Sequence, residues 1–111
     1  MDDEALAYVP AYVLAQKIAT GDLSATDVVE AAITRAQRLQ PMLNFVAVER
    51  YERARDEARA AARIVAGGGP LGPLHGVPIT IKDNIATQGD PLTHGSYAFE
   101  NVIAPGSATL A

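Results

Sequence analysis

The side chains that could do chemistry gather in the second half of the chain, around Lys82. Lys82, Asp83 and Asn84 come directly after VPITI, an apolar run that alternates like a buried strand. A lysine in this place has three interpretations: a surface charge, a structural ion-pair partner, or a catalytic base that loses its proton because burial disfavours the charge. Spacing alone leaves the three open. Asp83 and Asn84 are expected to be turn residues that bond their own backbone.

The histidines and serines give weaker chemical signals. His75, in PLHG, is expected to be a loop histidine bonded to backbone, and isolated His94 has no carboxylate pair beside it at metal-ligand spacing. Ser24 is expected to cap a helix, and Ser96, in THGSY, does not match the G-x-S-x-G elbow of α/β-hydrolases. The sequence therefore predicts neither a metal site nor a serine–histidine mechanism.

Composition narrows the class of protein. A chain of 111 residues forms one domain at most, and its net charge of -4 argues against nucleic acids and anionic membranes as partners. The absence of cysteine excludes disulfides, zinc–thiolate sites and thiol nucleophiles. The N-terminus is acidic, where a secretory signal would be basic, and no apolar run approaches the length of a membrane span. We expect a cytoplasmic protein.

The elements that must position Lys82 begin with a helical half, residues 1–69. A short helix is predicted from Ala11 to Thr20, because its apolar residues recur at helical spacing and Gly21 follows. Ser24 is expected to begin a second helix, whose apolar stripe runs to a stop before Pro41. Both helices end at residues that disfavour a further turn.

The strongest helix signal lies in ERYERARDEARAAARIVAGGG, residues 49–69. Small apolar residues share one face and imply close packing, and Glu and Arg fill the other face. The small face consists of Ala54, Ala58, Ala62 and Val65. The arginines are expected to form ion pairs between residues four apart on a solvated face. Residues 44–48, just before, could be a small strand or a lead-in to this helix.

Residues 70–111 form a strand-and-loop half, in which glycines and prolines separate short apolar pieces. A strand is expected along VPITIK, with Thr80 and Lys82 on its polar face. Its buried face would comprise Val77, Ile79 and Ile81. Tight turns are expected at Gln88 to Pro91 and around Pro105 and Gly106.

The stretch GPLHGVPITIKDNIATQGDPLTHGS, residues 72–96, resembles the lysine-bearing segment of the amidase signature family of amidohydrolases. It keeps the order G-P-L-H-G, a small apolar strand, K-D-N, then a threonine and a G-S pair. Upstream, LAQKIATGDLSATDVVEAAITRAQRLQPMLNFVAV resembles the helical N-terminal region of the same family. The resemblance therefore extends over nearly the whole chain.

The resemblance implies an α/β fold, with a mixed central sheet flanked by helices, of which this chain holds the N-terminal helical part and the first strand or strands. It implies hydrolysis of a carboxamide to a carboxylate and ammonia by a serine nucleophile, a second serine in a cis peptide, and a lysine that Lys82 matches. Such a lysine must be neutral, so burial after an apolar strand would favour its role as a base. No cofactor is implied.

The expected partners follow from the same resemblance. They are a small-molecule amide substrate and either a second copy of the protein or amidotransferase subunits, as for proteins that resemble the A-subunit of glutamyl-tRNA amidotransferase. Aliphatic, aryl and peptide amides and glutamine all stay open as substrates. Neither direct binding of nucleic acid nor binding to a membrane is expected.

None of the serines in residues 1–111 matches either serine of the triad. The chain is therefore interpreted as the N-terminal portion of a single amidase domain, and by itself it is expected to be inactive. Two alternatives stay open: a noncatalytic helical interaction module that keeps an amidase-like sequence, and a lysine that forms a Schiff base with a carbonyl substrate.

Overall fold

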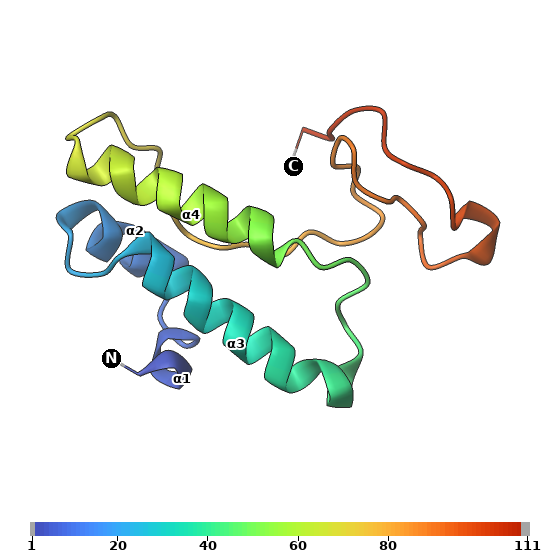
Figure 1. The fold of residues 1–111 in the computed structure, drawn as a ribbon, viewed down its shortest axis with the longest axis horizontal. Coiled ribbons are helices and arrows are strands. Elements are labelled where there is room, and N and C mark those ends of the chain that lie inside the picture. Colours follow the sequence, from blue (N-terminus) through green and yellow to red (C-terminus); the bar gives the residue numbers. More distant parts are fainter. Residues whose placement is uncertain (1, 110–111) are drawn as a thin grey trace. The chain divides into compact units, whose positions relative to one another are not determined.

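The computed structural model describes residues 2–109, which divide into two compact units between Pro78 and Ile79. The helical unit, up to Pro78, contains α1 (Asp3–Leu6), α2 (Ala11–Thr20), α3 (Ala25–Leu43) and α4 (Tyr51–Ala66) (Figure 1). The loop unit, from Ile79 on, contains the 3-10 helix η1 (Tyr97–Phe99) as its one helical element within the described residues.

Local capping signals define the first helices. The predicted bounds of α2 are confirmed: Gly21 follows Thr20 in the left-handed conformation, with φ of 82°, and its N–H donates to the carbonyl of Ile18 at 3.1 Å. Ser24 is confirmed as the cap of α3, because its hydroxyl accepts from the N–H of Thr26 at 3.3 Å. The short α1 was not predicted, although Asp2 caps it.

The predicted stop before Pro41 is wrong, because α3 continues through Pro41 to Leu43. A proline in the last turn of a helix removes only one hydrogen bond, and here the side chain of Gln40 stabilises the exit. Its Oε1 accepts from the N–H groups of Phe45 and Val46 at 3.1 and 2.9 Å, and its Nε2 donates to the carbonyl of Val46 at 3.0 Å. Residues 44–48 are an irregular lead-in to α4.

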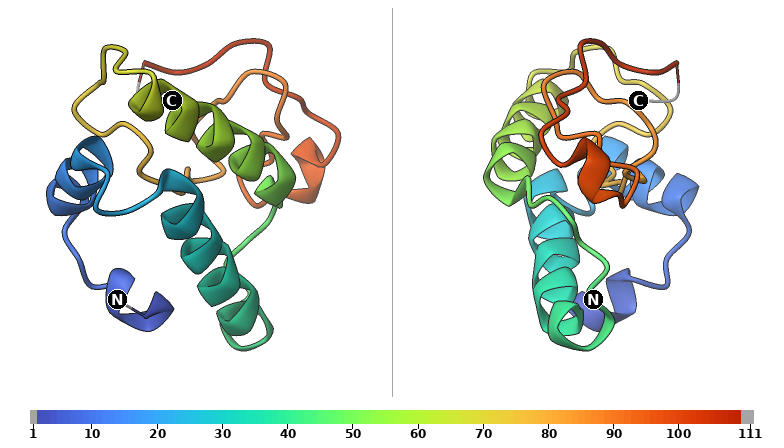
Figure 2. Two further views of the ribbon diagram at one scale, coloured as in Figure 1. Left: turned by 60° about the vertical axis from the view of Figure 1, so that its left-hand side comes forward. Right: turned by 90° about the vertical axis from the view of Figure 1, so that its right-hand side faces the viewer.

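Two apolar clusters hold the helical unit together. The first joins α1, α2 and α3 and contains Leu6, Leu14, Ile18, Ala25, Val28 and Ala31. The second joins α3 to α4 through Val29, Ile33 and Ala58, with Tyr51 and Ala54 packed against it. Two further views show α3 beside α4, and the short α1 near the C-terminal half of α3 (Figure 2). The predicted alanine face of α4 is confirmed, since Ala58 is 4% exposed.

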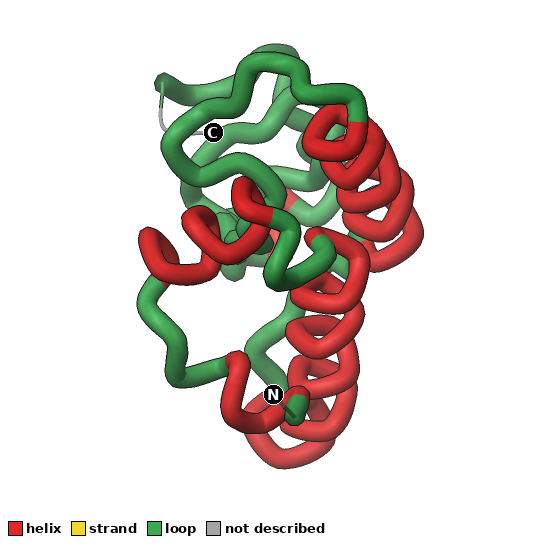
Figure 3. Tube along the Cα trace, turned by 90° about the vertical axis from the view of Figure 1, so that its left-hand side faces the viewer, coloured by secondary structure: helices red, strands yellow, loops and turns green. Residues whose placement is uncertain are grey.

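The predicted strand over residues 77–82 is wrong for the described part of the chain. These residues have no regular secondary structure, and Ile79 and Ile81 are 68% and 41% exposed. A strand exists only where a neighbour accepts its backbone hydrogen bonds, and residues 2–109 offer it none. Their one bridge pairs Pro91 with Ile103. Residues 67–109 are accordingly loop apart from η1 (Figure 3), and the expected mixed sheet is not seen among them.

No helix within residues 2–109 combines the length and the hydropathy that crossing a bilayer requires.

Candidate active site

A few residues before Lys82, the turn formed by residues 72–76 is anchored on the helical unit. His75 Nε2 lies 3.0 Å from the carbonyl oxygen of Ala61 on α4, so the predicted backbone-bonded histidine is confirmed. Gly76 has φ of 78°, and a Cβ there would lie 2.9 Å from Cβ of Ala25. A side chain at this position would be strained twice, by its backbone conformation and by the contact. His75 and Gly76 therefore hold this turn against α4 and the start of α3.

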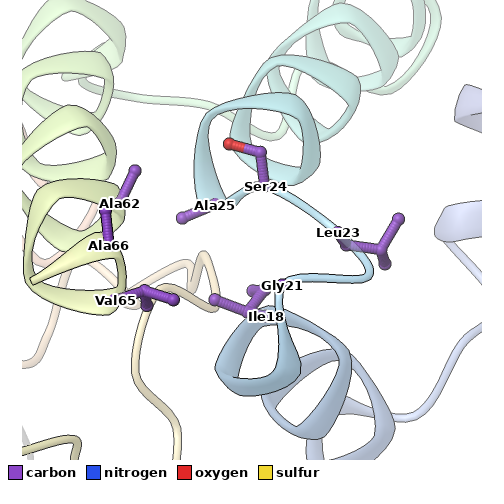
Figure 4. A pocket seen from close by; sticks show the side chains of 8 residues that line it. All are labelled: Ile18, Gly21, Leu23, Ser24, Ala25, Ala62, Val65 and Ala66. Carbon is purple, nitrogen blue, oxygen red and sulfur yellow. The ribbon is translucent and has the colours of Figure 1, made fainter. Parts of the chain in front are cut away.

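An apolar hollow of about 270 Å³ lies in the same unit, between the end of α2, the start of α3 and the last turns of α4 (Figure 4). It is lined by Ile18, Gly21, Leu23, Ser24, Ala25, Ala62, Val65 and Ala66. Ser24 is its one polar side chain, and that hydroxyl already caps α3. None of these eight lining residues carries a titratable side chain.

Lys82 lies in the loop unit, and its side chain is exposed. Its carbonyl accepts from the N–H of Ile85 at 2.9 Å, which closes a turn over residues 82–85. Lys82 forms no ion pair with any residue that the structure describes. The burial expected for this lysine is therefore absent from residues 2–109, because no second strand covers either side of the segment that precedes it.

Asp83 bonds a residue ten positions away and not its own turn, which corrects the expectation from sequence. Its Oδ1 accepts from the backbone N–H of Thr93 at 3.1 Å, and its Oδ2 accepts a short hydrogen bond from the Thr93 hydroxyl. Hydrogen bonds to a carboxylate favour its charged form. The Thr93 hydroxyl and then the Thr93 N–H lower the pKa of Asp83 below its ordinary value, with smaller contributions from Gly95 and His94.

Thr93 is itself held by backbone pairing in the loop unit. The segment before it pairs with residues 102–104: Leu92 N–H donates to Val102, Ala104 N–H donates to Asp90, and Gly89 N–H donates to Ala104, each at 2.9 Å. The turn predicted at Gln88 to Pro91 lies one residue earlier, where the N–H of Asp90 donates to the carbonyl of Thr87 at 3.0 Å. The predicted bend at residues 105–106 is confirmed. The backbone of Thr93, the partner of Asp83, is therefore held in place by these hydrogen bonds.

The serines all have structural roles. The hydroxyl of Ser96 accepts from the N–H of Ala98 at 3.2 Å and caps η1, and that of Ser107 accepts from the N–H of Gln88 at 3.0 Å. The ring of His94 meets Phe99 edge-on, with centroids 5.9 Å apart. Within residues 2–109 no three His, Asp or Glu side chains gather where they could hold a metal. Lys82 stays the candidate catalytic residue of the described chain, and the hydrogen-bonded pair Asp83 and Thr93 lies next to it in the sequence and the turn.

Comparisons with known proteins agree on one family. Residues 27–111 match the family model described as Amidase. An indoleacetamide hydrolase of Bradyrhizobium diazoefficiens is 44% identical over 96 residues, which cover 86% of this chain and 18% of that protein. The A-subunit of the glutamyl-tRNA(Gln) amidotransferase of Prochlorococcus marinus is 35% identical over 97 residues, 87% of this chain and 20% of that one.

The fold of the described residues also has a solved counterpart. A bacterial aryl acylamidase of the amidase signature family superimposes with a TM-score of 0.80 at 32% sequence identity. The match covers 92% of this chain and 21% of the acylamidase. The chain thus spans about a fifth of the length of the proteins that it matches.

Proposed function

Because this chain belongs to the amidase family, we propose that residues 1–111 form the N-terminal part of an enzyme that hydrolyses a carboxamide to a carboxylate and ammonia. The observation that carries the proposal is the match of residues 27–111, which include Lys82 in its K-D-N sequence, to the family. The likeness in fold to an aryl acylamidase supports it. A noncatalytic module has no such specific support.

In this proposal Lys82 is the base of a serine–serine–lysine triad. The two serines, a nucleophile and a bridging serine in a cis peptide, come from protein beyond residue 111. As the nucleophile attacks the carbonyl carbon, the bridging hydroxyl takes its proton and passes its own to the neutral Nζ of Lys82. The resulting ammonium returns a proton by the same route to the amide nitrogen, which leaves as ammonia when the C–N bond breaks. Water then releases the carboxylate from the acyl enzyme.

The proposal requires that Lys82 be covered in the complete enzyme. Ile79 and Ile81, just before it, are large apolar side chains exposed to solvent in the described residues. We propose that this segment joins a mixed central sheet, in which further strands bury both isoleucines and the stem of Lys82. Desolvation there would disfavour the charged ammonium form, which makes the neutral amine available as a base near neutral pH.

The direct test replaces Lys82 in the complete amidase. Lys82→Ala should lower kcat about 10²- to 10⁴-fold, the usual contribution of a positioned base. Lys82→Arg should fail as badly, since a guanidinium stays protonated at accessible pH. Lys17→Ala, at the other lysine of residues 1–111, is the control and should keep normal turnover. Ammonia release from indoleacetamide and from a simple aryl amide is the measurement. Near-normal turnover by Lys82→Arg would remove the base role.

One relative supports a second candidate function. The 35% identity to the A-subunit of an amidotransferase favours an enzyme that releases ammonia from glutamine and passes it to a partner protein. Glutaminase activity that rises when candidate partner proteins are added, without turnover of indoleacetamide or aryl amides, would select this function. Assembly as a homodimer stays a prediction, which light scattering on the complete protein checks.

A further inference from the structure

The contacts beside Lys82 suggest how the protein keeps this lysine available as a base. We propose that Asp83 and Thr93 are positioning residues: Thr93 holds the Asp83 carboxylate away from the Nζ of Lys82 and fixes the turn that presents the lysine. This inference rests on the proposed role of Lys82 in amide hydrolysis. Neither Asp83 nor Thr93 is assigned a contact with the substrate.

The carboxylate of Asp83 would be a harmful neighbour if it were free. Asp83 follows Lys82 directly, in the turn over residues 82–85, so a free carboxylate there could pair with the ammonium. An opposite charge within about 4–6 Å stabilises the ammonium and raises the pKa of a lysine, the reverse of what a base needs. Instead, both carboxylate oxygens accept hydrogen bonds from Thr93, and no ion pair of Lys82 occurs within the described chain.

Thr93 is suited to this task because its own hydroxyl is oriented. Oγ1 accepts from the N–H of Gly95 at 3.3 Å, so its proton is left to point at Asp83. The Thr93 carbonyl accepts from the N–H of Ser96 at 2.9 Å, and the preceding Leu92 pairs with Val102. The hydrogen-bond donor is therefore fixed by backbone contacts on both sides.

The other titratable group that acts on Asp83 is His94, next to Thr93, whose cation further favours the carboxylate. An imidazole is largely neutral above pH 7.5, roughly one unit above its ordinary pKa. Rate profiles should therefore be recorded in a His94→Gln background as well, which removes this second charge near Asp83.

The test measures kcat/KM against pH in the complete amidase, with indoleacetamide or an aryl amide as substrate. Thr93→Val removes the hydroxyl, frees Oδ2 of Asp83 and should move the acid limb upward by about one pH unit. It should lower kcat near neutral pH about tenfold and change KM little. Thr93→Ser keeps the hydroxyl and should restore the wild-type profile. In the double variant Asp83→Asn/Thr93→Val no charge is left to pair with Lys82, so the upward shift should vanish.

A matched control and a second variant keep the outcomes separable. Glu100→Gln removes an exposed carboxylate of the same unit and should leave the profile unchanged. If Thr93→Val does not fold, Asp83→Glu keeps the charge but misplaces the carboxylate, and should move the limb upward as well. The inference is overturned if the acid limb of the kcat/KM profile does not move in folded Thr93→Val or Asp83→Glu. It is also overturned if the double variant shifts this limb as far as Thr93→Val does. If Lys82→Ala keeps its turnover, the proposed function fails instead, and that result is independent of Thr93.

Discussion

Arg55 on α4 binds Glu30 on α3 through two parallel hydrogen bonds. Its Nε donates to Oε2 of Glu30 at 2.8 Å, and its Nη2 donates to Oε1 at 2.7 Å. The sequence predicted only ion pairs within α4, such as Arg53 with Glu57 at 3.0 Å, which is confirmed. The pair across the helices was not predicted. The hydrogen bonds from Arg55 lower the pKa of the Glu30 carboxyl group. The same hydrogen bonds, followed by one to Glu52, raise the pKa of Arg55.

The first prediction concerns this pair. A double-mutant cycle with Glu30→Gln and Arg55→Met should give a larger coupling free energy than the cycle with Glu57→Gln and Arg53→Met. The reason is that a bidentate guanidinium–carboxylate pair has two aligned hydrogen bonds and joins two helices, whereas the other pair joins adjacent turns. Urea unfolding of the chain, followed by helical circular dichroism, is the measurement. Equal couplings would contradict a special role for the bridge between α3 and α4.

Contacts between residues close in the sequence, such as Arg53 with Glu57, could be predicted from the sequence, whereas contacts between helices, such as Glu30 with Arg55, could not. Gly21 and Ser24 signal helix ends through their own backbone and hydroxyl chemistry, so those bounds follow from sequence. The fate of Pro41 depends on the side chain of Gln40 folding back over the helix end. Such a contact has no reliable pattern in the residues alone. The same holds for Glu30 and Arg55, which lie 25 positions apart.

The candidate site divides in the same way. The bond of His75 to a backbone carbonyl was predicted from its place in a loop and is confirmed, whereas the catalytic role of Lys82 rests on its motif alone and stays a prediction. The hydrogen bond between Asp83 and Thr93 could not be predicted from sequence, because the two residues meet only where the chain between them turns back. The strand over residues 77–82 was expected from alternation, but alternation predicts a face and not the neighbouring strand that must pair with it.

The second prediction tests the close packing of α4 against α3. Ala58 is 4% exposed and packs against Val29 and Ile33. Ala58→Leu should therefore destabilise the helical unit by roughly 1–3 kcal/mol through overpacking. Arg59→Ala is the neighbouring control on the solvated face and should change the unfolding midpoint much less. Equal, small shifts in the two variants would show that the buried face of α4 is wrongly assigned.

The third prediction concerns Gly76. Gly76→Ala should destabilise the helical unit by roughly 2–4 kcal/mol, because a left-handed backbone and a 2.9 Å contact with Ala25 both oppose the added methyl group. Gly72→Ala, in the same turn, meets no atom within 4 Å and should change stability by less than about 0.5 kcal/mol. The comparison uses urea midpoints of the two variants. A Gly76→Ala chain as stable as the Gly72→Ala chain would refute the anchored turn.

The last prediction follows the pH dependence of the bond between Asp83 and Thr93. The folded pKa of Asp83 is depressed, so the stability it contributes is fully present above the ordinary aspartate pKa of about 4 and is lost as pH falls through the lower folded value. The Thr93 amide proton reports this directly, since it donates to Oδ1. Its NMR chemical shift should titrate with a midpoint below that of Asp83 in the peptide TIKDNIA measured in the same buffer. In Thr93→Val, which loses the larger cause of the shift, the midpoint should move up toward that of the peptide. A midpoint at or above the peptide value in the unmodified chain would show that the two hydrogen bonds do not persist in solution.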